Sequence, residues 1–348
     1  MTSLLIVGHG TRDDEGAGQF RAFVERVGER ARGRADVPVE AVAGGFIELS
    51  PPPLRDTVAQ LVSQGRRDVV AVPLILLAAG HAKGDIPAAL ARERGRNPGL
   101  RTRYARPLGV HPEIIGLLRA RLAASAQPKP DAVLMVGRGT TDPDANADLH
   151  RAARLLWETT RDSGVEFVEP AFVSLARPSV GEGLERLARL GARRVTVLPY
   201  FLFAGVLPDR IVEHSERAAE TLGLDVTVGR LLGDSGLGDG DVLTDLVLDR
   251  YAEALAGPVA VNCDACVYRI AMPGFEDRVG AAQRPHDHPD DPAGHHHHGH
   301  GHDHSSGHMH AHAHQHPGEQ PHEKEHSAQG TQDSHSPVVS HTGPASVR

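Results

Sequence analysis

Leu4-Leu-Ile-Val-Gly-His-Gly-Thr11 is the stretch that decides the fold, because Val133-Leu-Met-Val-Gly-Arg-Gly-Thr140 repeats it 129 positions later, residue 8 against residue 137. Each copy is a short apolar run followed by two glycines, which is typical of a buried strand that ends in a tight turn. Two further segments repeat at an offset of 126: residues 46–49 match 172–175, and residues 68–73 match 194–199. We therefore interpret the chain as a tandem duplication of one domain.

The duplicated unit alternates between two patterns. In the first copy, short runs rich in β-branched residues alternate with segments whose apolar residues have helical spacing. We expect strands at 4–7, 39–47, 69–77 and near 101–106, and helices at 17–31, 51–65, 84–95 and 111–124. This alternation predicts an α/β fold in which each domain is a parallel sheet with helices on both faces.

Domain boundaries follow from the repeat and from composition. We expect a first domain at 1–126, a second at 130–257, and a Cys-x-x-Cys segment at 258–284. Residues 285–348 contain almost no large apolar side chains. They cannot bury enough surface to fold, so we expect them to form a disordered tail.

Composition excludes several classes of protein. Of the 37 basic and 45 acidic residues, the tail from 285 onward holds two and eight, so the remainder is nearly neutral. It lacks the basic excess of nucleic-acid-binding proteins. No apolar run reaches the roughly 18 residues that cross a bilayer, and Leu4–Val7 is too short for a secretory signal. We therefore expect a cytoplasmic protein without nucleic-acid or membrane partners.

Three side chains able to bind a metal ion fall at predicted strand ends. His9 follows the first strand, Glu48 the second and His81 the third. The carboxyl ends of parallel strands meet at one edge of a sheet, where ligands bind. A single histidine after a strand is more often a hydrogen-bonded surface residue, so the prediction of a metal site depends on the coincidence of all three.

The second repeat provides an internal comparison for these residues. At the matching positions it has Arg138, Ser174 and Val206, whereas the adjacent glycines and Pro199 are unchanged. The replacement of all three predicts one working domain and one domain that has lost metal ligation. The alternative is independent drift at each position.

Two neutral imidazoles and a carboxylate suit a borderline divalent ion such as Co²⁺, Ni²⁺, Fe²⁺ or Zn²⁺. An imidazole can also take up a proton near neutral pH. A site that holds a metal ion and accepts protons is suited to exchanging one for the other. Metal insertion into a tetrapyrrole is such an exchange, because the ion replaces two pyrrole N–H protons.

Three motifs that occur in order resemble those of a known family: Gly8-His-Gly-Thr-Arg12, Gly45-Phe-Ile-Glu-Leu49 and Ala79-Gly-His-Ala-Lys-Gly-Asp-Ile-Pro87. They are similar to the sirohydrochlorin chelatases, the class II chelatases of cobalamin and sirohaem synthesis, and in particular to long-form cobaltochelatases. The resemblance extends over about residues 3–280. It implies the chelatase fold, with two tandem flavodoxin-like domains that face each other across a cleft.

The resemblance also implies an enzyme that inserts a divalent metal ion into sirohydrochlorin and releases two protons. Co²⁺ for cobalamin is the expected metal, because a histidine-rich tail suits cobalt or nickel better than iron. A ferrochelatase that uses Fe²⁺ for sirohaem is the second choice. A non-catalytic metal store or metallochaperone is the alternative of a different class. We expect a monomer or a dimer.

The resemblance assigns roles to individual residues. His9 and His81 become the metal-binding, proton-accepting catalytic pair, with His9 the expected proton acceptor. Metal or substrate contacts are implied for Glu48, Leu76, Leu77, Ala78, Ala79 and Gly80. Because the substrate is a polycarboxylate, basic groups at the rim of the cleft should orient it. The candidates by position are Arg12, Lys83, Arg138 and Arg210, and for each a solvated surface charge is an equal alternative.

Cys263 and Cys266 are interpreted, through the resemblance, as ligands of an iron–sulfur cluster. Two cysteines cannot complete a four-thiolate cluster, so a shared cluster in a dimer or histidine ligands would be needed. The alternative is a pair that binds nothing. The tail holds 18 of the 23 histidines, which predicts a metal store. Its densest part comprises His295, His296, His297, His298, His300, His302 and His304.

Overall fold

The computed structural model describes residues 1–125, 129–160, 163–234, 236, 240–257, 259 and 276–281. The predictions made for Cys263, Cys266 and the histidine-rich tail lie outside these residues. Within the described part, no helix is both long and apolar enough to span a membrane.

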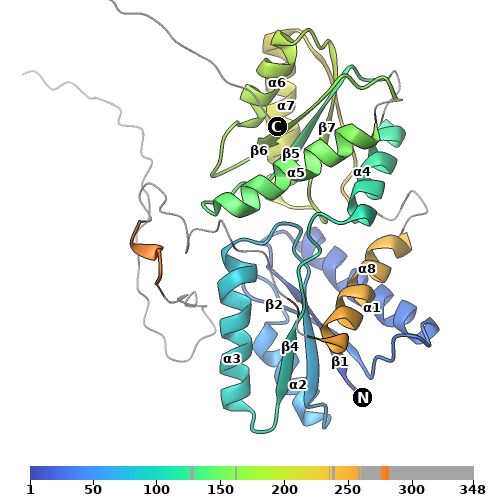
Figure 1. The fold of residues 1–348 in the computed structure, drawn as a ribbon, viewed down its shortest axis with the longest axis vertical. Coiled ribbons are helices and arrows are strands. Elements are labelled where there is room, and N and C mark those ends of the chain that lie inside the picture. Colours follow the sequence, from blue (N-terminus) through green and yellow to red (C-terminus); the bar gives the residue numbers. More distant parts are fainter. Residues whose placement is uncertain are drawn as a thin grey trace, which may run out of the picture. The chain divides into compact units, whose positions relative to one another are not determined.

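Two four-stranded parallel sheets form the centre of the fold (Figure 1). Their strand orders are β2-β1-β3-β4 and β6-β5-β7-β8, so the chain builds the same topology twice. The strands are β1 (Ser3–Gly8), β2 (Val42–Phe46), β3 (Asp68–Pro73), β4 (Arg101–Tyr104), β5 (Ala132–Gly137), β6 (Phe167–Phe172), β7 (Arg194–Pro199) and β8 (Asp225–Val228). The predicted duplicated α/β fold is confirmed.

Helices cover both faces of the first sheet. Alternate residues of β1 enter different cores, because side chains alternate across a strand: Leu4 and Ile6 face one core, and Leu5 and Val7 face the other. The first core is closed by α1 (Asp14–Gly33) and α8 (Gly240–Ala256), and the second by α2 (Leu54–Ser63) and α3 (Ile86–Arg96). Figure 1 shows α3 and α8 on opposite sides of β4. We call this sheet with its four helices the first lobe.

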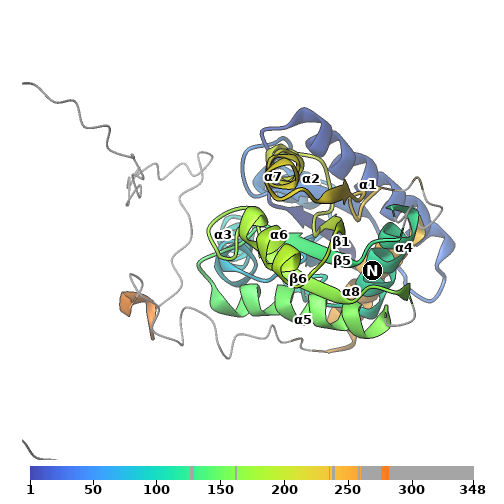
Figure 2. The same cartoon turned by 90° about the horizontal axis from the view of Figure 1, so that it is seen from above.

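The second sheet is covered in the same way. Val133 and Met135 of β5 extend the core of Leu4 and Ile6 into the second repeat, together with α4 (Pro112–Ser125) and α5 (Pro143–Thr159). Leu134 and Val136 face α6 (Val180–Arg189) and α7 (Val206–Leu222). Seen from above, α5 and α7 lie on opposite sides of β5 (Figure 2). We call this sheet with α4–α7 the second lobe.

The last helix of each repeat packs against the other repeat. Helix α4 follows β4 but contacts α5 and β7, whereas α8 follows β8 but contacts α1, β3 and β4. Two buried arginines stabilise the exchange. Arg121 of α4 donates hydrogen bonds of 2.6–2.9 Å to the carbonyls of Leu231, Leu232 and Asp234, on the segment that leads into α8. Arg250 of α8 reciprocates by donating to the carbonyls that precede α4, at residues 107 and 108.

The sequence-based boundaries need one correction near the third strand. The expected strand 69–77 ends at Pro73, and the following residues leave the sheet as a loop. The helix expected at 84–95 begins at Ile86 and is preceded by a π-helical turn, η1 (His81–Asp85). A continuous apolar run does not distinguish a strand from a buried loop, and this explains the error.

Candidate active site

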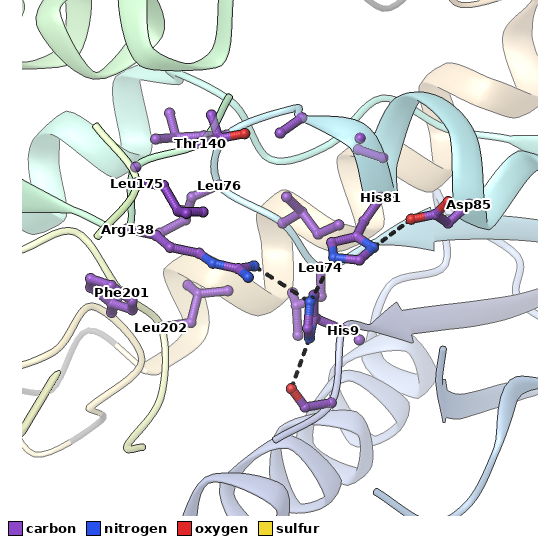
Figure 3. Close-up of a pocket in the computed structure, with 18 of the residues that line it drawn as sticks. His9, Leu74, Leu76, His81, Asp85, Arg138, Thr140, Leu175, Phe201 and Leu202 are labelled. Atoms are coloured by element: carbon purple, nitrogen blue, oxygen red, sulfur yellow. Dashed lines mark hydrogen bonds and ion pairs between the residues drawn. The ribbon is translucent and has the colours of Figure 1, made fainter. Parts of the chain in front are cut away.

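A cavity of about 760 Å³ opens at the carboxyl ends of β1 and β3. These neighbouring strands are the point where the chain order reverses in the first sheet, which is where α/β sheets bind ligands. Figure 3 shows His9 and His81 directed toward one another, with Arg138 facing them from the second lobe. Both lobes line the cavity, with residues that include Gly8–Thr11, Leu74–Leu77, Arg138–Thr141 and Tyr200–Ala204.

The loop that carries His9 depends on Gly10. Gly10 has a φ of +102°, and a Cβ atom there would lie 1.8 Å from the carbonyl oxygen of Glu48. Only glycine therefore lets the segment after β2 approach the segment after β1. The amide of Glu48 then donates to the carbonyl of His9 at 3.2 Å. This close approach brings the Glu48 carboxylate to the imidazole.

His81 is presented by the π-helical turn rather than by a strand end, which corrects the expected position. Within η1 its Nδ1–H donates to Oδ2 of Asp85 at 2.6 Å. The hydroxyl of the half-buried Tyr104, at the end of β4, donates to the carbonyl of Ala82 at 2.7 Å. Burial raises the pKa of Tyr104, so the hydroxyl stays protonated as a donor. The turn is thereby fixed from the adjoining strand.

The three predicted metal ligands converge. Nε2 of His9 lies 2.8 Å from Nε2 of His81 and 3.1 Å from Oε1 of Glu48. One candidate ligand atom from each residue falls within 4.8 Å of the others, and all three residues are half-buried. The cluster therefore has the residue types and spacing that a metal site requires.

The hydrogen bonds at the Nδ1 atoms of His9 and His81 fix the tautomers of both rings, and the tautomers decide whether the cluster can hold a cation. Nδ1 of His9 lies 3.0 Å from the carbonyl oxygen of Gly10, which can only accept, so Nδ1 carries the hydrogen. Asp85 imposes the same tautomer on His81. In neutral rings both Nε2 atoms then present lone pairs to each other and to a carboxylate oxygen. A cation placed among these three atoms would relieve the repulsion between them.

Because the pKa of His9 is low, a metal ion is favoured over a proton as that cation. The pKa of His9 is lowered to about 4, mainly by burial and next by the neighbouring His81. The hydrogen bond to Gly10 and the charge of Glu48 oppose this shift without cancelling it. At neutral pH His9 is therefore unprotonated, and its Nε2 is available as a ligand.

A family model named CbiX matches residues 3–125 and, a second time, residues 132–254. The chain belongs to the CbiX family. The double match confirms the tandem repeat.

Named relatives of this CbiX chain are metal chelatases. A sirohydrochlorin cobaltochelatase of Priestia megaterium is 38% identical over 280 residues, which cover 78% of this chain and 86% of that protein. A sirohydrochlorin ferrochelatase of the same organism is 36% identical over 219 residues, covering 62% and 79% of the two chains. These relatives confirm the family that the motifs indicated.

Solved structures agree with this placement in the CbiX family. SirB from Bacillus subtilis with Fe³⁺ superposes with a TM-score of 0.61 at 29% identity, over 74% of this chain and 96% of that chain. SirB from Bacillus subtilis subspecies spizizenii in complex with cobalt gives 0.59 at 27% identity, over 74% and 97%. The predicted chelatase fold is confirmed.

The predicted substrate contacts are brought together in part. Leu76, Leu77, Ala79 and Gly80 line the cavity, and Glu48 joins the ligand cluster. Ala78 is not among the described lining residues. Of the four candidate cations, Arg138 lines the cavity, whereas Arg12 and Arg210 are exposed and are not among the described lining residues.

Lys83 is the clear correction among these cations. Its side chain is only 3% exposed, and its ammonium group donates to Asp142 at 2.9 Å and to Asp144 at 3.0 Å. Burial alone would lower the pKa of Lys83, but the hydrogen bonds and charges of both aspartates outweigh it and raise the pKa. Lys83 is thus a buried ionic link between the lobes and not a free cation at the rim.

Sequence reasoning missed Asp85 and the second-lobe segment Tyr200–Ala204. Asp85 stands four residues after His81, a spacing that places two side chains on one face of a helix. That signal was hidden because the expected helix began only at residue 84. Tyr200–Ala204 had no chemical signal, since it contributes apolar and backbone surface to the cavity.

We expect the substitution Asp85→Asn to lower kcat/KM for metal insertion by about 10- to 100-fold, the usual cost of removing an outer partner of a metal-ligating histidine. The asparagine amide no longer imposes one tautomer on His81, since it can donate as well as accept. Steady-state kinetics checks this, with the exposed Asp56→Asn variant as control. Wild-type rates in Asp85→Asn would contradict the role given to the carboxylate.

Proposed function

We propose that this chain is a sirohydrochlorin chelatase that inserts Co²⁺ into sirohydrochlorin for cobalamin biosynthesis, with release of two protons. The observation that carries the proposal is the convergence of two imidazole lone pairs and a carboxylate on one point of the cavity wall. The cavity volume also falls within the range of small-molecule sites, about 300–1,000 Å³. The names of the CbiX relatives support the same substrate.

In the proposed reaction, the metal substrate binds to His9, His81 and Glu48. The tetrapyrrole lies in the cavity against the apolar segments Leu74–Leu77 and Tyr200–Ala204, with its ring nitrogens directed at the metal. As the ion passes to the ring nitrogens, two pyrrole N–H protons leave. Each imidazole regains an Nε2 lone pair at that moment, so the pair can accept both protons.

The two histidines differ in the groups at their Nδ1 atoms. For His9, the proton acceptor that the sequence predicts, burial is the largest cause of a pKa lowered to about 4, so a proton there would leave readily. His81 instead donates from Nδ1 to the buried carboxylate of Asp85, so a negative charge lies beside the ring when it takes up a proton. We therefore propose His81 as the first proton acceptor, with His9 mainly a ligand.

Cobalt is favoured over iron because nitrogen ligands bind Co²⁺ more tightly than Fe²⁺. The relatives include both cobaltochelatases and ferrochelatases, so the choice of metal is our proposal. The cluster at Cys263 and Cys266, the metal-storing tail, the cytoplasmic location and the oligomeric state likewise stay predictions.

The test is anaerobic mixing of the full chain with sirohydrochlorin and either Co²⁺ or Fe²⁺, followed by the absorbance of the tetrapyrrole. We expect catalysed insertion of both ions, with the larger kcat/KM for Co²⁺. The uncatalysed rate with metal alone is the baseline. A protein that retains Co²⁺ but does not exceed this baseline would be a metal store, and a larger kcat/KM for Fe²⁺ would reassign the metal.

A further inference from the structure

The second lobe repeats the loops that carry His9 and Glu48, but it has a cationic and a neutral side chain in place of these two candidate metal ligands. The amide of Ser174 donates to the carbonyl of Arg138 at 3.0 Å, as the amide of Glu48 donates to that of His9. Leu49 and Leu175, which follow, have φ angles of +64° and +59°. The two loops therefore have the same backbone form. At these two positions the first lobe has an imidazole and a carboxylate, and the second has a guanidinium and a hydroxyl.

Arg138 is directed at the metal cluster of the other lobe. Its Nη1 lies 3.4 Å from Nε2 of His9 and donates toward that lone pair (Figure 3). The side chain is exposed in the cavity, and among the described residues it forms no ion pair with a carboxylate. A permanent cation thus stands beside the position of a divalent metal ion. Two like charges at such a distance repel each other unless an anion separates them.

We propose that Arg138 couples the binding of the anionic tetrapyrrole to the loading of the metal ion. In the empty cavity the guanidinium donates to His9 and opposes a cation there. When the substrate enters, Arg138 turns onto one of its carboxylates, because a charge-assisted bidentate pair is stronger than a single long hydrogen bond to an imidazole. The ligand cluster is then released, and the metal ion binds beside a neutralised charge. The substrate class recognised by Arg138 rests on the proposed function.

The coupling between the metal ion and the tetrapyrrole must be reciprocal. If the tetrapyrrole tightens metal binding by a given factor, the metal ion must tighten tetrapyrrole binding by the same factor. Arg138 contributes to that factor from both sides, since it weakens the metal complex when the substrate is absent and strengthens the substrate complex. Removing the charge of Arg138 should therefore raise the affinity for Co²⁺ alone and lower the affinity for sirohydrochlorin alone. A residue that merely supports the fold would weaken both.

The experiment compares the wild type with Arg138→Gln, both as full chains. Co²⁺ is titrated alone under anaerobic conditions, and the His9→Ala/His81→Ala double variant, which keeps every tail histidine, is subtracted as the blank. Binding of metal-free sirohydrochlorin is followed separately by fluorescence. We expect Arg138→Gln to bind Co²⁺ at the cluster of His9, Glu48 and His81 about three- to tenfold more tightly. Its affinity for sirohydrochlorin should fall about tenfold.

Two further variants sharpen the comparison. Arg138→Lys keeps the charge and should retain most of the opposition to Co²⁺, while losing the bidentate grip on a carboxylate. Arg12→Gln removes an exposed arginine that is not among the described lining residues and should change neither affinity. Unchanged or weaker Co²⁺ binding in Arg138→Gln would overturn the proposal, and so would unchanged sirohydrochlorin binding.

The measurements distinguish a failure of the Arg138 coupling from a failure of the proposed chelatase function. If the wild type inserts Co²⁺ but Arg138→Gln leaves both affinities unchanged, the coupling is wrong and the chelatase function stands. If the wild type inserts no metal while Arg138→Gln binds Co²⁺ more tightly, the guanidinium opposes the metal as described and the chelatase function fails.

Discussion

His81→Ala should reduce kcat/KM for metal insertion by at least about a hundredfold, since losing an outer partner of a metal-ligating histidine already costs 10- to 100-fold. The substitution removes one of two convergent Nε2 lone pairs and the ring that Asp85 supports. It should also remove the proposed proton acceptor. His9→Ala should have a comparable effect through loss of the other lone pair. Initial-rate absorbance assays over a range of sirohydrochlorin concentrations at saturating Co²⁺ give kcat/KM for both variants.

The matched control for these variants is His150→Ala, because His150 is an exposed histidine of α5 outside the described lining of the cavity. All three variants keep the complete tail, so they share its metal binding. We expect His150→Ala to retain nearly wild-type kinetics. Near wild-type insertion by a folded His9→Ala or His81→Ala protein would remove that histidine from the mechanism. Circular dichroism and the thermal midpoint establish that each variant is folded.

Lys83→Ala should lower the free energy of unfolding by about 3–5 kcal/mol, the usual cost of breaking a buried ion pair from one side. The Asp142 and Asp144 carboxylates, with side chains 3% and 11% exposed, would be left without their ammonium partner. Lys83 also belongs to the turn that carries His81, so insertion activity should fall together with stability. Urea denaturation measures the change.

Two further proteins test whether unpaired charge is the cause. Lys129→Ala, at an exposed position, should change the free energy of unfolding by less than about 0.5 kcal/mol. The triple variant Lys83→Met, Asp142→Asn, Asp144→Asn removes the charges from both sides and should recover most of the loss, because no ion remains buried alone. A loss below about 1 kcal/mol in Lys83→Ala would contradict the buried ionic link.

Part of the site was predictable because it follows from the strand pattern. His9 and Glu48 follow the ends of β1 and β2, and parallel strands bring their carboxyl ends to one edge of the sheet, whereas His81 joins them from η1. The role of Lys83 was not predictable. Its partners Asp142 and Asp144 stand about 60 residues away on the other repeat, and no local pattern reports such a contact. Arg138 was one of four equal candidates until the cavity set it apart.

The repeated Leu4–Thr11 stretch by itself determined the duplication and the α/β class, because strand and helix periods and a Gly-x-Gly turn are local properties of a chain. Only the tertiary structure decided that α4 and α8 exchange lobes, that Asp85 contacts His81, and that Arg138 faces His9 of the other lobe. Periodicity shows that a face of an element is apolar and must be buried. It does not show which partner covers that face, because this depends on packing between distant segments.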